Sequence, residues 1–223
     1  MMKSDYFTHK NIDDVSKAML QRLEKSSKRH RFTFSPDRAA LLILDMQKIF
    51  LDESSHAFVP SAPAIVPKIK RLAEAFAKSN RPILSTRHVN SEEDAMMMAR
   101  WWKDVIMESN PLNEIITELE VPKAVVIRKT QYDSFFQTPL EDRLRDMGID
   151  QLVVTGVLTH LCCETTSRSA FVRGFLVFIP VDGTATYNED FHFATYLNLS
   201  HGFAVPVLCD EVLEQMEAYV GGQ

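Results

Sequence analysis

The stretch AALLIL at residues 39–44 is a short, unbroken apolar run that ends at Asp45. A strand buried on both faces has this texture, whereas a strand with one face in water alternates apolar and polar residues. Similar runs recur at residues 81–86, 124–127, 151–156, 175–181 and 204–208. The repetition predicts six strands that are buried on both faces.

Helix-like stretches separate these runs. In residues 61–78, apolar side chains recur every three or four positions, as on one face of a helix. Residues 138–147 have Thr138 in a position to act as N-cap and are followed by Gly148, a common helix stop. Three further helices are predicted at residues 161–173, 190–201 and 210–219. Alternating strands and helices predict a Rossmann-like α/β fold, a three-layer α-β-α sandwich around a mostly parallel six-stranded sheet.

An amphipathic stretch at residues 11–24 precedes the strand pattern and predicts a helix that lies on the body or on a neighbouring subunit. We therefore divide the chain into an N-terminal helical arm, residues 1–37, and an α/β domain, residues 38–223. Residues 91–118 are the least regular part, and they suggest a helix or lid that carries Trp101 and Trp102.

The composition is that of an ordinary globular protein. The chain has 223 residues with a net charge of −5, which gives no electrostatic reason to expect a nucleic acid or an acidic membrane as partner. No apolar run approaches the roughly 18 residues that a membrane helix needs. Three cysteines form no disulfide framework, so we expect a reducing, cytoplasmic location.

Chemically useful side chains follow three of the predicted strands. Asp45 follows the first run, Lys129 the run at 124–127, and the adjacent Cys162 and Cys163 the run at 151–156. Each has an ordinary explanation by itself: a capping aspartate, a solvated lysine, a cysteine packed in the core. Ligands of an open parallel sheet bind beyond the carboxyl ends of its strands, so an acid, a base and a thiol are expected to meet in one crevice.

A thiol in this position suits nucleophilic chemistry. Cys162 falls at the start of the predicted helix 161–173, where free amides and a nearby Lys129 are expected to lower the thiol pKa. Asp45 is then placed to take the thiol proton and return it to a leaving group. The free amides of the turn are suited to hold an oxyanion.

Three blocks of sequence carry a family resemblance. LLILDMQKIF at 41–50, VIRKTQYDSFFQTPLEDRL at 126–144 and VTGVLTHLCCETTSRSAFVRGF at 154–175 resemble the signature blocks of the isochorismatase-like (cysteine hydrolase) superfamily. The resemblance implies a three-layer α/β sandwich and identifies residues 38–223 as an isochorismatase-like hydrolase domain.

The resemblance also assigns roles. It implies that Asp45, Lys129 and Cys162 are the catalytic residues and that Cys163 packs away from the crevice. It further implies a cis peptide bond between Val157 and Leu158, with the amides of Leu158 and Cys162 as the oxyanion donors.

Two reactions remain open within this superfamily. Amidases attack a carbonyl with the cysteine, whereas isochorismatases cleave a vinyl ether with the aspartate as acid, and several of them carry glycine at the position of Cys162. At the position of Gln131, isochorismatases typically have an arginine, which suits a dianionic substrate. Hydrolysis of a small-molecule amide or related C–N bond by a Cys162 thiolate is therefore our first hypothesis. Vinyl-ether hydrolysis with Asp45 as acid is the alternative, and a non-catalytic binding protein a remote one.

The remaining expectations concern ligands and partners. Arg87 and His88 follow the second strand without a further nearby histidine, so neither a zinc site nor a cofactor is expected. A small-molecule substrate and a homodimer or homotetramer are expected. The candidate substrate-binding residues are Phe50, Arg87, His88, Gln131, Tyr132 and His160.

Overall fold

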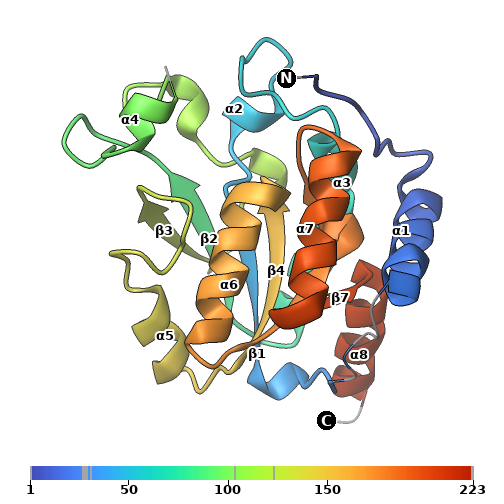
Figure 1. Ribbon diagram of the computed structural model, residues 1–223. Helices are drawn as coiled ribbons and strands as arrows, with labels where there is room; N and C mark the ends of the chain where they lie inside the picture. The colour runs from blue at the N-terminus through green and yellow to red at the C-terminus, as the bar shows by residue number, and fades with distance from the viewer. Residues whose placement is uncertain (1, 27–29, 31, 103, 123, 222–223) are drawn as a thin grey trace.

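A parallel sheet forms the centre of the protein, and the predicted apolar runs supply six of its strands. The computed structural model describes residues 2–26, 30, 32–102, 104–122 and 124–221, so parts of the predicted arm, residues 1, 27–29 and 31, lie outside the described residues. The strands lie in the order β3-β2-β1-β4-β5-β7, and every described pair is parallel (Figure 1). Their bounds are β1 Ala39–Leu44, β2 Ile83–His88, β3 Val125–Lys129, β4 Gln151–Val157, β5 Leu176–Pro180 and β7 Val205–Val207.

A seventh strand, β6 (Thr184–Ala185), pairs with the end of β4 and was not predicted. It is two residues long and has no apolar run of its own, so nothing in its sequence separates it from a loop. It adds to the sheet without changing its parallel character.

Helices cover both faces of the sheet. In Figure 1, α6 (Glu164–Val172) and α7 (Glu189–Gly202) lie on the near face, while α3 (Ala62–Lys78) packs against α8 (Cys209–Gly221) on the other side. The remaining helices are α1 Ile12–Ser26, α2 Lys48–Leu51, α4 Met98–Trp101 and α5 Leu140–Asp146. Short 3₁₀ turns span Pro36–Arg38, Pro111–Asn113, Thr117–Leu119 and Val181–Gly183.

The predicted helices are all present with bounds shifted by up to three residues, and the starts of two of them differ in their local structure. α5 begins at Leu140 with Pro139 in the N-cap position, one residue after the predicted Thr138, whose hydroxyl oxygen still accepts the Leu140 amide at 3.3 Å. The predicted helix at 161–173 is preceded by a π-helical turn, Thr159–Cys163, before α6 begins.

Close contact between β1 and β4 explains one glycine. Gly156 pairs with Leu44 in the parallel ladder and has a φ of 109°. A Cβ atom at this position would lie 2.1 Å from the Leu44 carbonyl oxygen. Only glycine permits this approach, which brings the end of β4 against the end of β1.

The N-terminal segment is part of the same core as the sheet. Tyr6, Phe7, Ile12 and Leu23 are all buried within the main hydrophobic cluster. In Figure 1 the segment from the N-terminus to α1 runs along one edge of the molecule, from the α2 end toward α8. The predicted boundary after residue 37 therefore separates two stretches of sequence that pack together.

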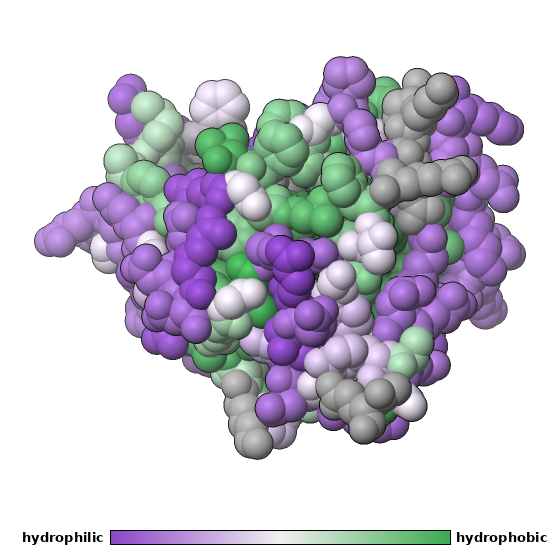
Figure 2. All heavy atoms as spheres, turned by 90° about the horizontal axis from the view of Figure 1, so that it is seen from below, coloured by the Kyte–Doolittle hydropathy of each residue, from purple (hydrophilic) through white to green (hydrophobic). Residues whose placement is uncertain are grey.

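The two ends of the sheet differ. Figure 2 shows the end that carries the amino termini of the strands, where a band of hydrophobic side chains crosses the upper part of the view and hydrophilic ones lie below it and at both sides. The carboxyl ends of the strands lie at the opposite end, beside α2 (Figure 1). Within the described residues, no helix is long and apolar enough to cross a membrane.

Candidate active site

The side chains that end β1 and β3 meet the turn that follows β4. The Lys129 Nζ atom lies 2.8 Å from Oδ2 of Asp45, 3.3 Å from Sγ of Cys162 and 3.2 Å from Nδ1 of His88. It also donates to the carbonyl oxygen of Gln131 at 2.9 Å. The side chains of Asp45 and Lys129 have no exposed surface, so this cluster is shielded from bulk water.

Asp45 is fixed by the neighbouring strand. The Thr86 hydroxyl donates to Asp45 Oδ1 at 2.6 Å, and the Asp45 amide donates to the Thr86 carbonyl at 3.2 Å. Asp45 itself has a φ of 53°, in the left-handed region that non-glycine residues rarely adopt. In this backbone conformation the chain turns from the end of β1 toward α2, while the carboxylate keeps its contacts with Thr86 and Lys129.

His88 is held as a neutral imidazole. Its Nδ1 atom accepts from Lys129, and its Nε2–H group donates to Asn90 Oδ1 at 3.1 Å. Burial, reinforced by the charge of Lys129, lowers the pKa of His88 to about 4. A buried Gln47 accepts the His88 amide at 2.8 Å and donates to the His88 carbonyl at 3.1 Å, which ties the ends of β1 and β2 together.

The three central groups rest as an ion pair beside a neutral thiol. Burial alone raises the pKa of Asp45, but the charge of Lys129, together with hydrogen bonds from Cys162 and Lys129, outweighs it and holds that pKa below its usual value. Burial lowers the pKa of Lys129, and Asp45 more than compensates, so the ammonium form is retained. Burial, together with the Asp45 charge, raises the pKa of the Cys162 thiol to about 12.

The expectation that the Cys162 thiol has a lowered pKa is therefore wrong for the resting state. Lys129 acts in the expected direction, but burial is the largest effect and Asp45 adds to it. Desolvation penalises the charged form of any group, and sequence gives no measure of desolvation.

The turn that carries Cys162 rests on a buried polar network. Within it, Thr159 donates to Thr184 at 3.0 Å and its oxygen lies 3.0 Å from Nδ1 of His192. The Tyr6 hydroxyl lies 2.9 Å from the same nitrogen, so the N-terminal segment supports this turn directly. Cys163 belongs to the hydrophobic core on the other side of the turn. The peptide bond between Val157 and Leu158 is cis.

A cavity of about 310 Å³ opens above this cluster. Its walls are mostly apolar or aromatic, and Cys162 and His88 lie among the lining residues. Of the predicted substrate-binding residues, Phe50, His88 and Tyr132 line it. The indole N–H of Trp102 donates to the Tyr132 hydroxyl at 2.6 Å, which fastens the 91–118 segment over the cavity.

Three predicted substrate-binding residues have other partners. Arg87 pairs with Glu108 and Glu114, at 2.6 and 3.3 Å. The Gln131 amide donates to two backbone carbonyl oxygens of the 91–118 segment, at 3.3 and 3.5 Å. The His160 ring stacks on Phe191 with a centroid distance of 4.4 Å. None of the three lies among the described residues that line the cavity.

Sequence reasoning missed several residues of the site. Lys3, His56 and Tyr187 line the cavity, and Gln47 and Asn90 orient His88. Gln47 carries a weak signal, because a polar residue three positions after a buried strand lies near the edge of the sheet where ligands bind. Lys3 carries none, since it lies far from every strand in the sequence.

A larger hollow of about 950 Å³ lies between β7, α8 and the segment around Phe34. Its described lining residues include neither a cysteine nor a lysine. The described residues around it include no counterpart of Cys162 or of the buried Asp45–Lys129 pair, so the smaller cavity remains the candidate active site.

The same cluster has a set of atoms that resembles a metal site. One ligand atom each of Asp45, His88 and Cys162 lies within 4.8 Å of the others. The Lys129 ammonium, however, is in contact with all three residues. A metal ion there would have to displace a buried cation, so these residues do not fit one.

Comparison with known proteins identifies the family of the chain. The isochorismatase domain profile matches residues 39–211. Nicotinamidase 3 of Arabidopsis thaliana is 37% identical over 179 residues, which cover 78% of this chain and 86% of that protein. Enterobactin synthase component B of Escherichia coli K12 is 30% identical over 186 residues, which cover 82% of this chain and 65% of that protein.

A solved structure gives the same result. A cysteine hydrolase from Pseudomonas syringae pv. phaseolicola 1448A superposes with a TM-score of 0.83 at 25% identity, covering 87% of this chain and 99% of that one. The chain belongs to the isochorismatase family and is an isochorismatase-like hydrolase.

Proposed function

We propose that this hydrolase cleaves a C–N bond of a small-molecule amide through a covalent intermediate on Cys162. The observation that carries the proposal is the contact of the buried Lys129 ammonium with both Asp45 and Cys162 at the floor of an apolar cavity. A cysteine beside a buried acid–base pair is the arrangement that acyl transfer requires. Its similarity to a nicotinamidase favours the same bond type.

The reaction follows from these contacts. Asp45 accepts the thiol proton of Cys162 while the sulfur attacks the carbonyl carbon of the amide. The C–N bond of the tetrahedral intermediate then breaks, and the proton passes from Asp45 to the departing nitrogen. Water attacks the resulting thioester, gives a proton to Asp45, and the acid product leaves as the thiol is restored.

The other groups would stabilise the negative charges that form during the reaction. The amides of Leu158 and Cys162 would donate to the oxyanion as it forms. Lys129 would stabilise the thiolate while it exists and pair with Asp45 before and after. With a resting thiol pKa of about 12, almost no thiolate is present at neutral pH. Proton removal must therefore accompany attack, which makes Asp45 essential as the base.

Vinyl-ether hydrolysis is the second candidate, because the relative from E. coli and an isochorismatase of Bacillus subtilis are each 30% identical to this chain. That reaction needs a protonated carboxyl group to act as acid. Burial raises the pKa of Asp45, but the charge of Lys129 holds it below its usual value, so this form is scarce at neutral pH. The balance of charges favours the amidase.

Replacement of each cysteine in turn tests the proposal. We expect Cys162→Ala to lower turnover of a responsive amide, sought in a panel that includes nicotinamide, by at least about 10³-fold, because the covalent route is lost. Cys163→Ala is the matched control: it removes an adjacent buried thiol from the core and is expected to change turnover only a few-fold. Mass spectrometry of quenched reactions should detect the acyl adduct on Cys162.

The outcome that contradicts the proposal is equally direct. Full amide turnover by Cys162→Ala excludes covalent catalysis. Release of pyruvate from isochorismate by wild type and Cys162→Ala alike would establish the vinyl-ether reaction in its place.

A further inference from the structure

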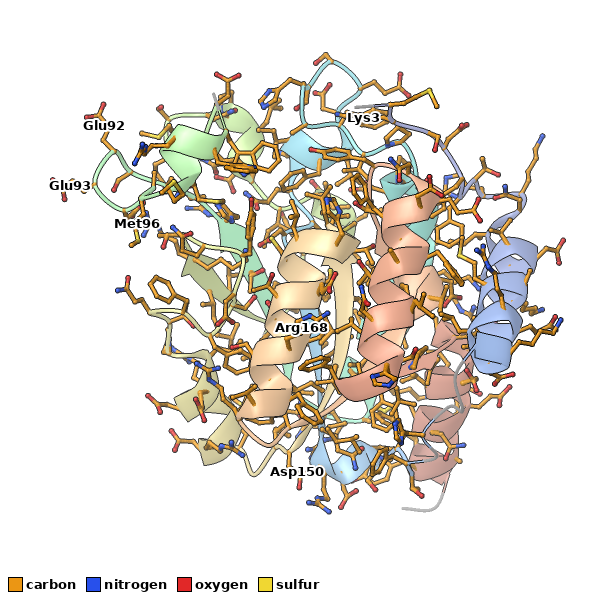
Figure 3. The ribbon with its side chains drawn as sticks, in the orientation of Figure 1. Lys3, Glu92, Glu93, Met96, Asp150 and Arg168 are labelled. Carbon is orange, nitrogen blue, oxygen red and sulfur yellow. The ribbon has the colours of Figure 1, made fainter. Side chains whose placement is uncertain are left out.

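The N-terminal segment brings a lysine to the active-site cavity. Lys3 lies among the residues that line the cavity with Cys162, although it stands outside the family match at residues 39–211. Figure 3 shows Lys3 at the end of the molecule that carries α2, with Asp150 at the opposite end. The segment is anchored there by the buried Tyr6 and Phe7, and the Phe7 amide donates to the Ser61 hydroxyl oxygen at 3.1 Å.

The Lys3 ammonium is held in place by neutral groups. It donates to the carbonyl oxygens of His56 and Phe58, each at 2.7 Å, and lies 4.5 Å from the centre of the Tyr187 ring. An ammonium has three N–H donors, so one remains without a carbonyl acceptor among the described residues. No carboxylate of the described chain forms an ion pair with it.

The surroundings favour an anion next to this group. Burial lowers the pKa of Lys3, which is the sign of an ammonium partly removed from water without a compensating charge. Lys3 is the one lysine or arginine among the described lining residues, and Asp104, which is exposed, is the one acidic residue there. A carboxylate that enters the cavity would therefore find a positioned, uncompensated cation in a mostly apolar setting.

We infer that Lys3 determines specificity by binding a carboxylate of the substrate, so that the amide cleaved at Cys162 has an apolar body and a separate anionic group. This inference rests on the proposed function for the identity of the scissile bond. The apolar part would contact walls such as Phe50, Met98 and Trp102. Recognition of the anion would thus come from a segment outside the family domain.

A purely structural role is the competing explanation. The contacts to the His56 and Phe58 carbonyls fasten the N-terminal segment to the loop before α3. In that case Lys3 would affect folding or cavity shape but would not distinguish a charged ligand from a neutral one. The test therefore compares charged and neutral reagents on the same protein.

Alkylation of Cys162 provides such a test without requiring turnover. Iodoacetate and iodoacetamide differ in a single charge, as do N-iodoacetylglycine and N-iodoacetylglycinamide, which reach further from the sulfur. Rate constants for modification of Cys162, located by peptide mass spectrometry, give a carboxylate-to-amide ratio for each pair. In Lys3→Gln we expect this ratio to fall about tenfold for at least one pair, since a hydrogen bond to a charged group is lost.

Two further variants control the measurement. Lys3→Arg keeps the charge and should retain most of the wild-type ratio. Lys10→Gln removes the same charge from an exposed position of the same segment and should leave both ratios unchanged.

The inference is overturned if Lys3→Gln keeps the wild-type ratio for both pairs, or if it slows the charged and neutral reagents equally. An equal fall in Lys10→Gln would also overturn it, because net charge would then be the cause. These results are independent of amide turnover, so they separate failure of this inference from failure of the proposed reaction.

Discussion

Lys129 lies between Asp45 and Cys162 and favours the ionised form of both. Lys129 lowers the pKa of Asp45 and so favours its ionised form. It also lowers the pKa of the Cys162 thiol, but burial raises that pKa by more. The negative charge of Asp45 in turn raises the thiol pKa. The resting state is consequently a protonated Cys162 thiol beside an ionised Asp45, which is the arrangement that the proposed proton transfer requires.

Removal of the Asp45 charge and removal of the Lys129 charge should shift the pKa of the Cys162 thiol in opposite directions. Asp45→Asn removes a charge that raises the pKa, so the midpoint of the pH dependence of Cys162 alkylation should move to lower pH. Lys129→Met removes a charge that lowers the pKa, so the midpoint should move to higher pH. Both variants should lose amide turnover, by about 10²-fold or more for the loss of the base.

Each single variant leaves one half of a buried ion pair alone, which costs about 3–5 kcal/mol of stability. The double variant Asp45→Asn/Lys129→Met removes both charges and therefore controls for this loss. Iodoacetamide rates across pH and thermal unfolding of the same samples supply the data. Shifts in the same direction for both single variants would refute this assignment of charges.

The junction of β4 with the turn after it determines where the nucleophile lies. β4 ends against β1, so Gly156 lies beside the residue that precedes Asp45. The turn then carries Cys162 back over the ends of the strands. The separation of Asp45 and Cys162 is therefore set by backbone packing between two central strands.

Gly156→Ala should disrupt this junction. The new Cβ would lie 2.1 Å from the Leu44 carbonyl oxygen, and the φ of 109° is unfavourable for alanine. We expect a loss of roughly 3 kcal/mol or more in the free energy of unfolding, from steric overlap and backbone strain together. Urea unfolding followed by circular dichroism measures this loss.

Gly202→Ala is the matched control. Its added Cβ would meet no atom within 4 Å, and it lies at the end of α7. The same substitution there should be neutral or stabilise the protein by about 0.5 kcal/mol. Equal stability of the two variants would show that the close approach of β4 to β1 is not constraining.

The protein as a whole encloses two neutral histidines. His88 lies beneath the cavity and His192 in the network below the turn, where its Nε2–H group donates to the Val181 carbonyl at 3.2 Å. Burial lowers the pKa of His192 to about 3 and, with Lys129, that of His88 to about 4. Tyr6, from the N-terminal segment, closes the network around His192. Folding of the segment, the sheet and the site is thereby coupled.

Stability should fall as the pH drops below about 6.5. Both histidines have folded pKa values below their ordinary value of 6.5, so the unfolded chain binds more protons between that pH and about 4. The free energy of unfolding should therefore decrease with falling pH, by roughly 1 kcal/mol per pH unit for each histidine in the lower part of this range.

Urea unfolding at several pH values tests this dependence. His192→Gln should reduce the pH dependence of the free energy of unfolding by the contribution of about one proton. His201→Gln, at an exposed position, should leave this dependence as in wild type. A wild-type slope in His192→Gln would contradict the linkage.

Much of the fold and of the candidate site follows from the sequence because both depend on local patterns. The run at 39–44 became β1 without any change of bounds, and the other five runs became strands of the same parallel sheet. Parallel strands share one carboxyl edge, so the residues that follow them, Asp45 and Lys129, could be expected to meet the Cys162 turn.

The tertiary structure alone decided the remainder. The raised pKa of Cys162 depends on burial and on the sum of nearby charges, neither of which is local in sequence. The positions of Arg87 and His160 depend on partners, Glu108 and Phe191, that sequence spacing does not identify. The place of Lys3 depends on the course of the N-terminal segment across the molecule. The sequence by itself thus determined which strand ends carry chemistry, and long-range packing decided which side chains complete the cavity and in which charge state they rest.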